Sequence, residues 1–166
     1  MQLCTTFFES FPLSVFRFPF LLLYLLGLTN KNRVASIYFH IPFCKRLCGY
    51  CDFYRSVKLK YIPEVVEAMH RELDCQSPFL HDRVVRTIYF GGGTPSLLAP
   101  SEIEGFVSHV RRLFDCSQLE EVTIEVNPDD ITPDYVAALR TTSVNRISMG
   151  VQSLDDGCLG FMGRRH

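Results

Sequence analysis

Short apolar runs alternate with longer segments of helical periodicity along the chain from Val34 onward. Four of the runs read as strands, and these are Ser36 to Ile41, Val85 to Phe90, Glu121 to Val126 and Arg146 to Val151. Strands that alternate with helices form parallel sheets, because each helix returns the chain to the end of the sheet where the next strand begins. The pattern therefore predicts an α/β fold of repeated strand-helix units.

Two segments between these strands carry apolar residues on one helical face. The first stripe is Ile62, Val65, Val66, Met69 and Leu73, and the second is Ile103, Phe106, Val107, Val110 and Phe114. Residues at such spacing share one side of an α-helix, which we expect to pack on the sheet. Ser101 and Glu104 have the spacing of a capping box, which predicts the start of the second helix.

Two further helices are indicated by their first residues. Thr132 suits the cap of a third helix and Pro133 its first turn, with Val136 and Leu139 facing inward. A fourth helix is expected to begin after Ser153, where two aspartates follow and suit the positive end of a helix.

The first 33 residues differ in composition from the rest of the chain. Six phenylalanines accompany an apolar run that reaches Leu28. The uninterrupted part of this run is shorter than the roughly 20 residues that a membrane-spanning helix needs. No Lys or Arg precedes Arg17, whereas a secretory signal begins with a basic region. We therefore expect residues 1–33 to be an extension outside the fold, without a membrane partner, and residues 34–166 to form the domain.

Composition and charge narrow the functional classes. A formal net charge of -1 over 166 residues gives no general attraction to nucleic acid, so no nucleic-acid partner is expected. Seven cysteines are present, and three of them crowd together, which fits a disulfide scaffold poorly. The crowding indicates a metal site in a reducing compartment. The four scattered cysteines are interpreted as buried structural residues, and they are Cys4, Cys75, Cys116 and Cys158.

The crowded cysteines follow the first predicted strand on one loop. Cys44, Cys48 and Cys51 have the spacing Cys-x3-Cys-x2-Cys. Thiolates are the usual ligands of iron-sulfur clusters, and three ligands for four irons leave one iron open to a small molecule. Lys45 and Arg46 lie beside the thiols and would favour their deprotonated form.

A structural zinc site is the alternative interpretation of these cysteines. Zinc normally takes four ligands, so a residue such as His40 or Cys75 would have to complete the set. The chain has no second Cys-x2-Cys or His-x3-His pair. The spacing favours a cluster over zinc, and both interpretations stay open at this point.

Three consecutive glycines, residues 91–93, follow the second predicted strand and precede Thr94. Without side chains this backbone can approach a ligand closely and offer its amide groups. The Lys-Ser/Thr ending of a phosphate loop is absent, and a plain tight turn is the simplest alternative. Glu125 and Gln152 end the third and fourth strands, so they could meet the cysteine loop at the carboxyl edge of a parallel sheet.

The combination of motifs resembles the HemW and oxygen-independent coproporphyrinogen III oxidase group of the radical S-adenosylmethionine superfamily. The likeness runs from about Val34 to His166 and rests on Tyr38-x-His40-Ile-Pro-Phe-Cys44, the glycine motif, Glu125-Val-Asn-Pro and Arg146-Ile-Ser-Met-Gly-Val-Gln152. The resemblance implies a partial (β/α) TIM-like barrel with about four strand-helix units of an expected six. Residues 34–166 would then be the amino-terminal part of a truncated core domain.

The same resemblance implies roles for individual residues. Cys44, Cys48 and Cys51 would ligate a [4Fe-4S] cluster, whose open iron would bind the amino and carboxylate groups of S-adenosylmethionine. The expected cofactor contacts are Tyr38, Tyr50, Gly92, Gly93, Thr94, Glu125, Gln152 and Arg164. No catalytic residue is assigned. The implied chemistry is reductive cleavage of the cofactor to methionine and a 5'-deoxyadenosyl radical, with an electron donor as partner.

Phe53 distinguishes the two branches of this group. The oxidases that the chain resembles carry a further cysteine two residues after the third ligand, where this chain has Phe53. The residue favours the HemW-like branch, which implies heme trafficking in the cytoplasm with heme and a heme-acceptor protein as partners.

One alternative is a coproporphyrinogen III oxidase acting on porphyrinogen, and another is a non-catalytic metal-binding domain or inactive fragment. Catalysis is expected from the family and left open for this chain, and heme binding is implied for the longer members.

Overall fold

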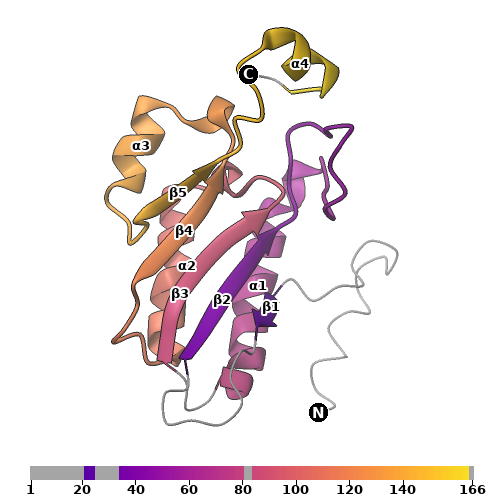
Figure 1. Ribbon diagram of the computed structural model, residues 1–166. Coiled ribbons are helices and arrows are strands. Elements are labelled where there is room, and N and C mark those ends of the chain that lie inside the picture. Colours follow the sequence, from indigo (N-terminus) through magenta and orange to yellow (C-terminus); the bar gives the residue numbers. More distant parts are fainter. Residues whose placement is uncertain (1–20, 25–33, 81–83, 165–166) are drawn as a thin grey trace, which may run out of the picture.

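The computed structural model describes residues 21–24, 34–80 and 84–164 (Figure 1). Its strands and α-helices are β1 (Leu21–Tyr24), β2 (Val34–Ile41), α1 (Ile62–Gln76), β3 (Val84–Gly92), α2 (Pro100–Leu113), β4 (Glu121–Val126), α3 (Pro133–Leu139), β5 (Arg146–Met149) and α4 (Asp156–Phe161). Strands and helices alternate from β2 to α4, which confirms the predicted α/β fold and its four strand-helix units.

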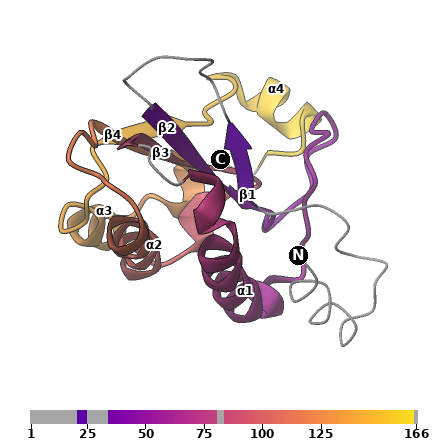
Figure 2. The same ribbon diagram turned by 90° about the horizontal axis from the view of Figure 1, so that it is seen from below.

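The five strands form one sheet in the order β1-β2-β3-β4-β5. The four strands from β2 to β5 are parallel. Seen from below, α1, α2 and α3 lie together against one face of this sheet (Figure 2). Each helix therefore returns the chain so that the next strand is added directly beside the last one.

β1 belongs to the segment that we expected to lie outside the fold. It pairs antiparallel with β2, and Leu21 is opposite Phe39. The other residues of the 1–33 extension, Cys4 among them, lie outside the described residues.

The core lies between the sheet and α1 and α2. Alternate residues of β2, β3 and β4 point toward these helices, where the rings of Phe39, Phe90 and Phe106 are buried together. The ring centroids of Phe39 and Phe90 are 4.9 Å apart, and those of Phe39 and Phe106 are 4.8 Å apart. Both predicted helical stripes face this core, although Phe114 lies just beyond α2 and is only partly buried.

Two predictions are wrong: the capping box at the start of α2 and the inward orientation of Val136 in α3. The N-cap of α2 is Ala99, and the carboxylate of Glu102 accepts a hydrogen bond from the Ala99 backbone N–H at 2.8 Å. The capping box expected at Ser101 and Glu104 is absent because Ser101 lies inside the helix, and Glu104 accepts hydrogen bonds from Ser143. In α3, Thr132 caps the helix as predicted, by accepting from the Tyr135 N–H, but Val136 faces outward with 37% exposure.

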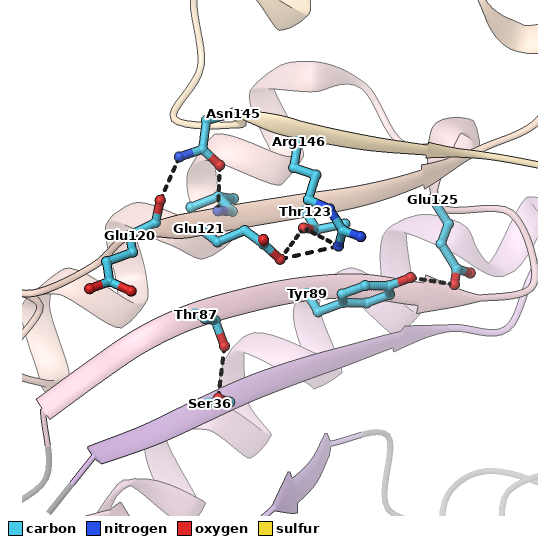
Figure 3. Close-up of polar contacts among 10 residues, drawn as sticks. Ser36, Thr87, Tyr89, Glu120, Glu121, Thr123, Glu125, Asn145 and Arg146 are labelled. Carbon is cyan, nitrogen blue, oxygen red and sulfur yellow. Dashed lines mark hydrogen bonds and ion pairs between the residues drawn. The ribbon is translucent and has the colours of Figure 1, made fainter.

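The other face of the sheet is polar (Figure 3). Side chains that alternate with the core residues hydrogen-bond across the strands, such as Thr87 with Ser36 at 2.7 Å. On the neighbouring strands, Arg146 donates to the carboxylate of Glu121 at 3.2 Å. The sheet therefore has an apolar face, which the helices cover, and a polar face on the opposite side.

The scattered cysteines are less buried than predicted. Cys75 and Cys158 are exposed and Cys116 is partly buried, so the expectation of buried structural residues is wrong for the first two. Within residues 21–24, 34–80 and 84–164, no helix has the length and apolar character needed to cross a membrane.

Candidate functional site

A cavity of about 410 Å³ opens at the carboxyl end of the parallel strands. It collects residues from the loops that follow β2, β3 and β4, together with the segment from β5 to the end of α4. Ten of the residues predicted for the site line this cavity, and they are Cys44, Cys48, Tyr50, Cys51, Gly92, Gly93, Thr94, Glu125, Gln152 and Arg164. Tyr38 lies outside the lining, and so does Gly91.

The cysteine loop is closed by backbone hydrogen bonds. The Cys44 N–H donates to the Ser56 carbonyl at 3.0 Å, and the Ser56 N–H donates to the Pro42 carbonyl at 2.6 Å. Cys44 is only 9% exposed, whereas Cys48 and Cys51 are partly buried. The loop thus folds back on its own start at Pro42 and Cys44, and all three of its cysteines line the cavity.

Two of the three thiols receive hydrogen bonds from other parts of the chain. The Thr94 hydroxyl donates to Cys44 Sγ at 3.5 Å, and Arg164 Nη1 donates to Cys48 Sγ at 3.9 Å. Burial raises the pKa of the Cys44 thiol, and the Thr94 hydrogen bond and the positive charge of Arg55 act in the opposite direction. The predicted cofactor contacts Thr94 and Arg164 therefore also contact the thiols directly.

The sequence indicated Lys45 and Arg46 as the cations beside the thiols, and both line the cavity. Lys45 was expected to favour the thiolates, but its ammonium group forms an ion pair with Asp130 at 2.5 Å. Arg55 lies along the loop and donates to the carbonyl oxygen of Cys48 at 3.1 Å. The positive charge of Arg55 opposes the rise in the pKa of Cys44 that burial causes, so Arg55 contributes the kind of effect that was expected of Lys45.

The glycine motif is packed too tightly for side chains. Gly92 has a φ of +106°, and a Cβ atom there would lie 2.6 Å from the imidazole of His40. A Cβ atom on Gly93 would lie 2.6 Å from the Phe43 carbonyl oxygen, just before the cysteine loop. The motif therefore lets β3 end directly against the start of that loop, so a tight approach within the fold explains part of its glycine content.

Glu125, which lines the cavity, forms a polar group with two tyrosines that lie outside the lining. The Tyr89 hydroxyl donates to Glu125 at 2.8 Å (Figure 3), and the rings of Tyr38 and Tyr89 stack with centroids 5.9 Å apart. Burial, followed by the charge of Glu125, raises the pKa of Tyr38 to about 12. Tyr38 is also 3.3 Å from His40 Nδ1, while His40 Nε2 is 3.1 Å from the Tyr54 carbonyl oxygen.

Gln152 and Arg164 close the far side of the cavity. Gln152 is the only non-glycine residue among those described with a positive φ, which is 67°. Arg164 Nη2 donates to the Gly150 carbonyl oxygen at 2.6 Å, so the end of α4 is tied back to the end of β5. The same guanidinium contacts Cys48, which links the segment after α4 to the loop after β2.

The zinc alternative gains no fourth ligand from the expected residues. His40 and Cys75 do not line the cavity, and both ring nitrogens of His40 have other partners. In the part of the chain that the structure describes, no three His, Cys, Asp or Glu side chains are grouped to hold a single ion. Among the described residues, Cys44, Cys48 and Cys51 line the cavity without a fourth cysteine or a histidine beside them.

The model of the Radical SAM superfamily matches residues 38–166. The chain therefore belongs to the Radical SAM superfamily. The chain is similar to the heme chaperone HemW of Lactococcus lactis, at 38% identity over 131 residues, which cover 79% of this chain and 34% of that protein.

Two further relatives come from the other branch of the group. The oxygen-independent coproporphyrinogen III oxidase of Bradyrhizobium diazoefficiens is 33% identical over 126 residues, covering 73% of this chain and 28% of that protein. The solved structure of coproporphyrinogen III oxidase (HemN) from Escherichia coli, described as a radical SAM enzyme, superposes with a TM-score of 0.72 at 29% identity. That likeness covers 81% of this chain and 31% of the enzyme, so the chain spans about a third of the relatives it matches.

Proposed function

We propose that Cys44, Cys48 and Cys51 hold a [4Fe-4S] cluster and that S-adenosylmethionine binds beside it in the cavity. The observation that carries this proposal is the convergence of three thiols, the glycine motif and Glu125 on one cavity. The cavity lies at the carboxyl ends of parallel strands, where α/β proteins bind their ligands. Membership of the superfamily supports both groups.

The residues present fit these two groups. Thiolates are the usual protein ligands of iron-sulfur clusters, and a cavity of about 410 Å³ is within the range of small-molecule sites. The Nε atoms of Arg55 and Arg164 are buried and have no hydrogen-bond partner among the described residues. Both arginines line the cavity. Unpaired buried donors are rare in folded proteins, so these two suit an anionic group such as a carboxylate.

When bound, the cluster supplies one-electron reduction of the sulfonium cofactor. The residues of the chain hold and shield the reacting groups. Thr94 and Arg164 donate to the sulfur atoms of Cys44 and Cys48, which stabilises negative charge on them. Glu125 accepts from the Gly92 N–H and keeps the glycine backbone fixed beside the cysteine loop. The low exposure of Cys44 keeps water away from the first thiol.

Anaerobic reconstitution tests the proposal. The wild-type chain is incubated with iron and sulfide, and we expect about four irons and four sulfides per chain. The dithionite-reduced sample should give an electron paramagnetic resonance signal that changes when S-adenosylmethionine is added. Cys48→Ala should lose most of the iron, whereas Cys75→Ala should retain it, because Cys75 is exposed on α1. Stoichiometric zinc, or iron that survives in Cys48→Ala, would contradict the proposal.

We further infer that the chain belongs to a HemW-like protein of heme trafficking. The support is its likeness to the Lactococcus heme chaperone and the residue Phe53, which lines the cavity and is 63% exposed. The apolar ring of Phe53 suits packing against the face of a porphyrin, whereas a cysteine at this position would suit a metal. Heme and a heme-acceptor protein would then be its partners. A reducing compartment such as the cytoplasm suits the three neighbouring thiols.

Coproporphyrinogen III oxidation is the second candidate, because the superposition on HemN extends over most of the chain. The two functions are separated by two assays on the reconstituted chain. Heme trafficking requires heme binding, seen as a shift in the heme absorption spectrum, followed by transfer to an apoprotein. Oxidation requires decarboxylated product from coproporphyrinogen III, detected by mass spectrometry in the presence of an electron donor. Product formation without heme binding would favour the oxidase.

A further inference from the structure

We propose that Asp130 is a positioning residue that holds the cysteine loop against the loop after the glycine motif, and that this contact shields Cys44. The contact involves three loops at the carboxyl edge of the sheet. The contacts themselves are part of the fold. The proposal rests on the proposed function only in the experiment that measures cluster assembly.

The side chain of Asp130 lies in the connection between β4 and α3 and is 4% exposed. Its Oδ1 accepts from Lys45 Nζ at 2.5 Å, and its Oδ2 accepts from the Ser96 hydroxyl at 2.9 Å. Ser96 is 5% exposed and also accepts from the Asn127 backbone N–H at 3.1 Å. One carboxylate therefore joins the loops that follow β2, β3 and β4.

The burial of Asp130 makes these partners necessary. A carboxylate that is removed from water stays charged only if it is paired and hydrogen-bonded. Lys45 supplies the opposite charge and Ser96 supplies a second donor. Burial and then the charge of Asp130 raise the pKa of Tyr135 to about 12, as expected where water screens a carboxylate poorly. Loss of Lys45 removes the opposite charge from this buried carboxylate, and loss of the Ser96 hydroxyl removes a donor to it, so either change should weaken the contact between the loops.

Lys45 and Ser96, which both contact Asp130, lie close in the chain to Cys44 and to its hydrogen-bond donor Thr94. Lys45 directly follows Cys44 in the chain, and Ser96 lies two residues after Thr94. The Thr94 hydroxyl donates to Cys44 Sγ at 3.5 Å. Because Asp130 holds the residues on both sides of this hydrogen bond, it keeps Cys44 against Thr94 and out of solvent. Cys48 is held separately, through Arg55 and Arg164.

The test measures the alkylation rate of each cysteine in the full chain without a cluster. Iodoacetamide labelling is followed for Cys44, Cys48 and Cys51 by peptide mass spectrometry, in wild type, Asp130→Asn, Lys45→Met and Lys45→Arg. We expect Cys44 to react about tenfold faster in Asp130→Asn and Lys45→Met, since charge-assisted hydrogen bonds are among the stronger ones. Lys45→Arg should restore protection because it retains a cation.

The matched control is Glu120→Gln, which removes a carboxylate from the exposed ion pair between Arg86 and Glu120. It should leave all three rates unchanged. If Asp130→Asn does not fold, Lys45→Met is the second variant, because it changes a side chain that is 40% exposed and leaves Asp130 and Ser96 in place. An unchanged Cys44 rate in Lys45→Met would overturn the proposal. An equal rise at all three cysteines would also overturn it, since it would indicate general loosening.

Iron uptake separates this proposal from the proposed function. After reconstitution, Lys45→Met should hold at most about half the iron of wild type, because an exposed Cys44 is a poorer ligand. If wild type takes up no iron while the Cys44 rate still depends on Lys45, the cluster proposal fails and the positioning role stands. If wild type takes up iron and the Cys44 rate is independent of Lys45, the positioning role fails and the cluster proposal stands.

Discussion

Glu125 accepts a hydrogen bond from the backbone N–H of Gly92, with 3.1 Å between Oε2 and N. Its other oxygen accepts from the Tyr89 hydroxyl at 2.8 Å. A carboxylate on β4 therefore fixes the backbone of the glycine motif on the neighbouring strand. The backbone conformation of the glycine motif thus depends on Glu125, which lies 33 positions after Gly92 in the chain.

Glu125→Gln should destabilise the chain. The amide has one oxygen for the two donors that the carboxylate satisfies, so one of them loses its acceptor. We expect the free energy of unfolding to fall by about 1–3 kcal/mol in urea denaturation. Glu121→Gln on the same strand is the control, since Glu121 is 39% exposed and its pairing with Arg146 should contribute less than about 1 kcal/mol. Equal losses in the two variants would refute this role of Glu125.

Gly92→Ala should be more harmful than an ordinary glycine substitution. The new Cβ would lie 2.6 Å from the His40 ring, at a φ of +106° that other residues rarely adopt. We expect a loss of more than about 2 kcal/mol in the free energy of unfolding. In Gly105→Ala, within α2, the new methyl group has open space around it. That variant should gain about 0.5–1 kcal/mol, because alanine favours the helix. A similar loss in both variants would argue against the packing explanation.

Two tyrosine-to-phenylalanine changes should have opposite effects. The Tyr135 hydroxyl is buried without a hydrogen-bond partner among the described residues, whereas the Tyr89 hydroxyl donates to Glu125. Tyr135→Phe should be neutral or stabilising by up to about 1 kcal/mol, and Tyr89→Phe should be destabilising by about 1 kcal/mol. Thermal unfolding of the two variants provides the comparison. Destabilisation by Tyr135→Phe would show that its hydroxyl has a partner after all.

His70 should make the chain less stable in acid. Its Nδ1 is 2.8 Å from Nδ1 of His109, and its ring stacks on Phe106 with centroids 4.1 Å apart. Burial, followed by the charges of His109 and Arg112, lowers the pKa of His70 below 6.5, although Asp74 acts in the opposite direction. The unfolded chain then binds more protons in acid, so stability is lost as the pH falls below about 6.5.

The urea midpoint should therefore be lower at about pH 5.5 than at about pH 7.5, and His70→Gln should reduce that difference. Nuclear magnetic resonance titration of the His70 ring gives its pKa directly. Arg112→Gln should raise that pKa, because it removes a neighbouring positive charge. A His70 pKa at or above its ordinary value would contradict the prediction.

Much of the fold could be predicted because its signals are local. The apolar stripes of α1 and α2 and the alternation along β2, β3 and β4 follow from which residues must avoid water. Val136 was misplaced because α3 is short and only Leu139 of the predicted pair reaches the core. β1 was not predicted because its pairing with β2 depends on a partner strand rather than on its own sequence.

The site could be predicted as far as its residues lie in motifs. The cysteines, the glycines and Glu125 belong to short patterns whose positions at strand ends imply a common edge. Asp130 was missed because its contact with Lys45 joins residues 85 positions apart, and no spacing in the chain indicates it. Arg55 was missed for a related reason: its effect depends on how the cysteine loop turns back on itself.

The strand order from β2 to β5 follows the chain without a jump. During synthesis each new strand can therefore pair with a neighbour that is already made, and no unit has to wait for a distant one. The residues named for the cavity are synthesised in the same order: the three cysteines come first, the glycine motif and Glu125 follow, and Arg164 comes last. Cys48 consequently meets its guanidinium donor only after the chain as far as Arg164 has left the ribosome.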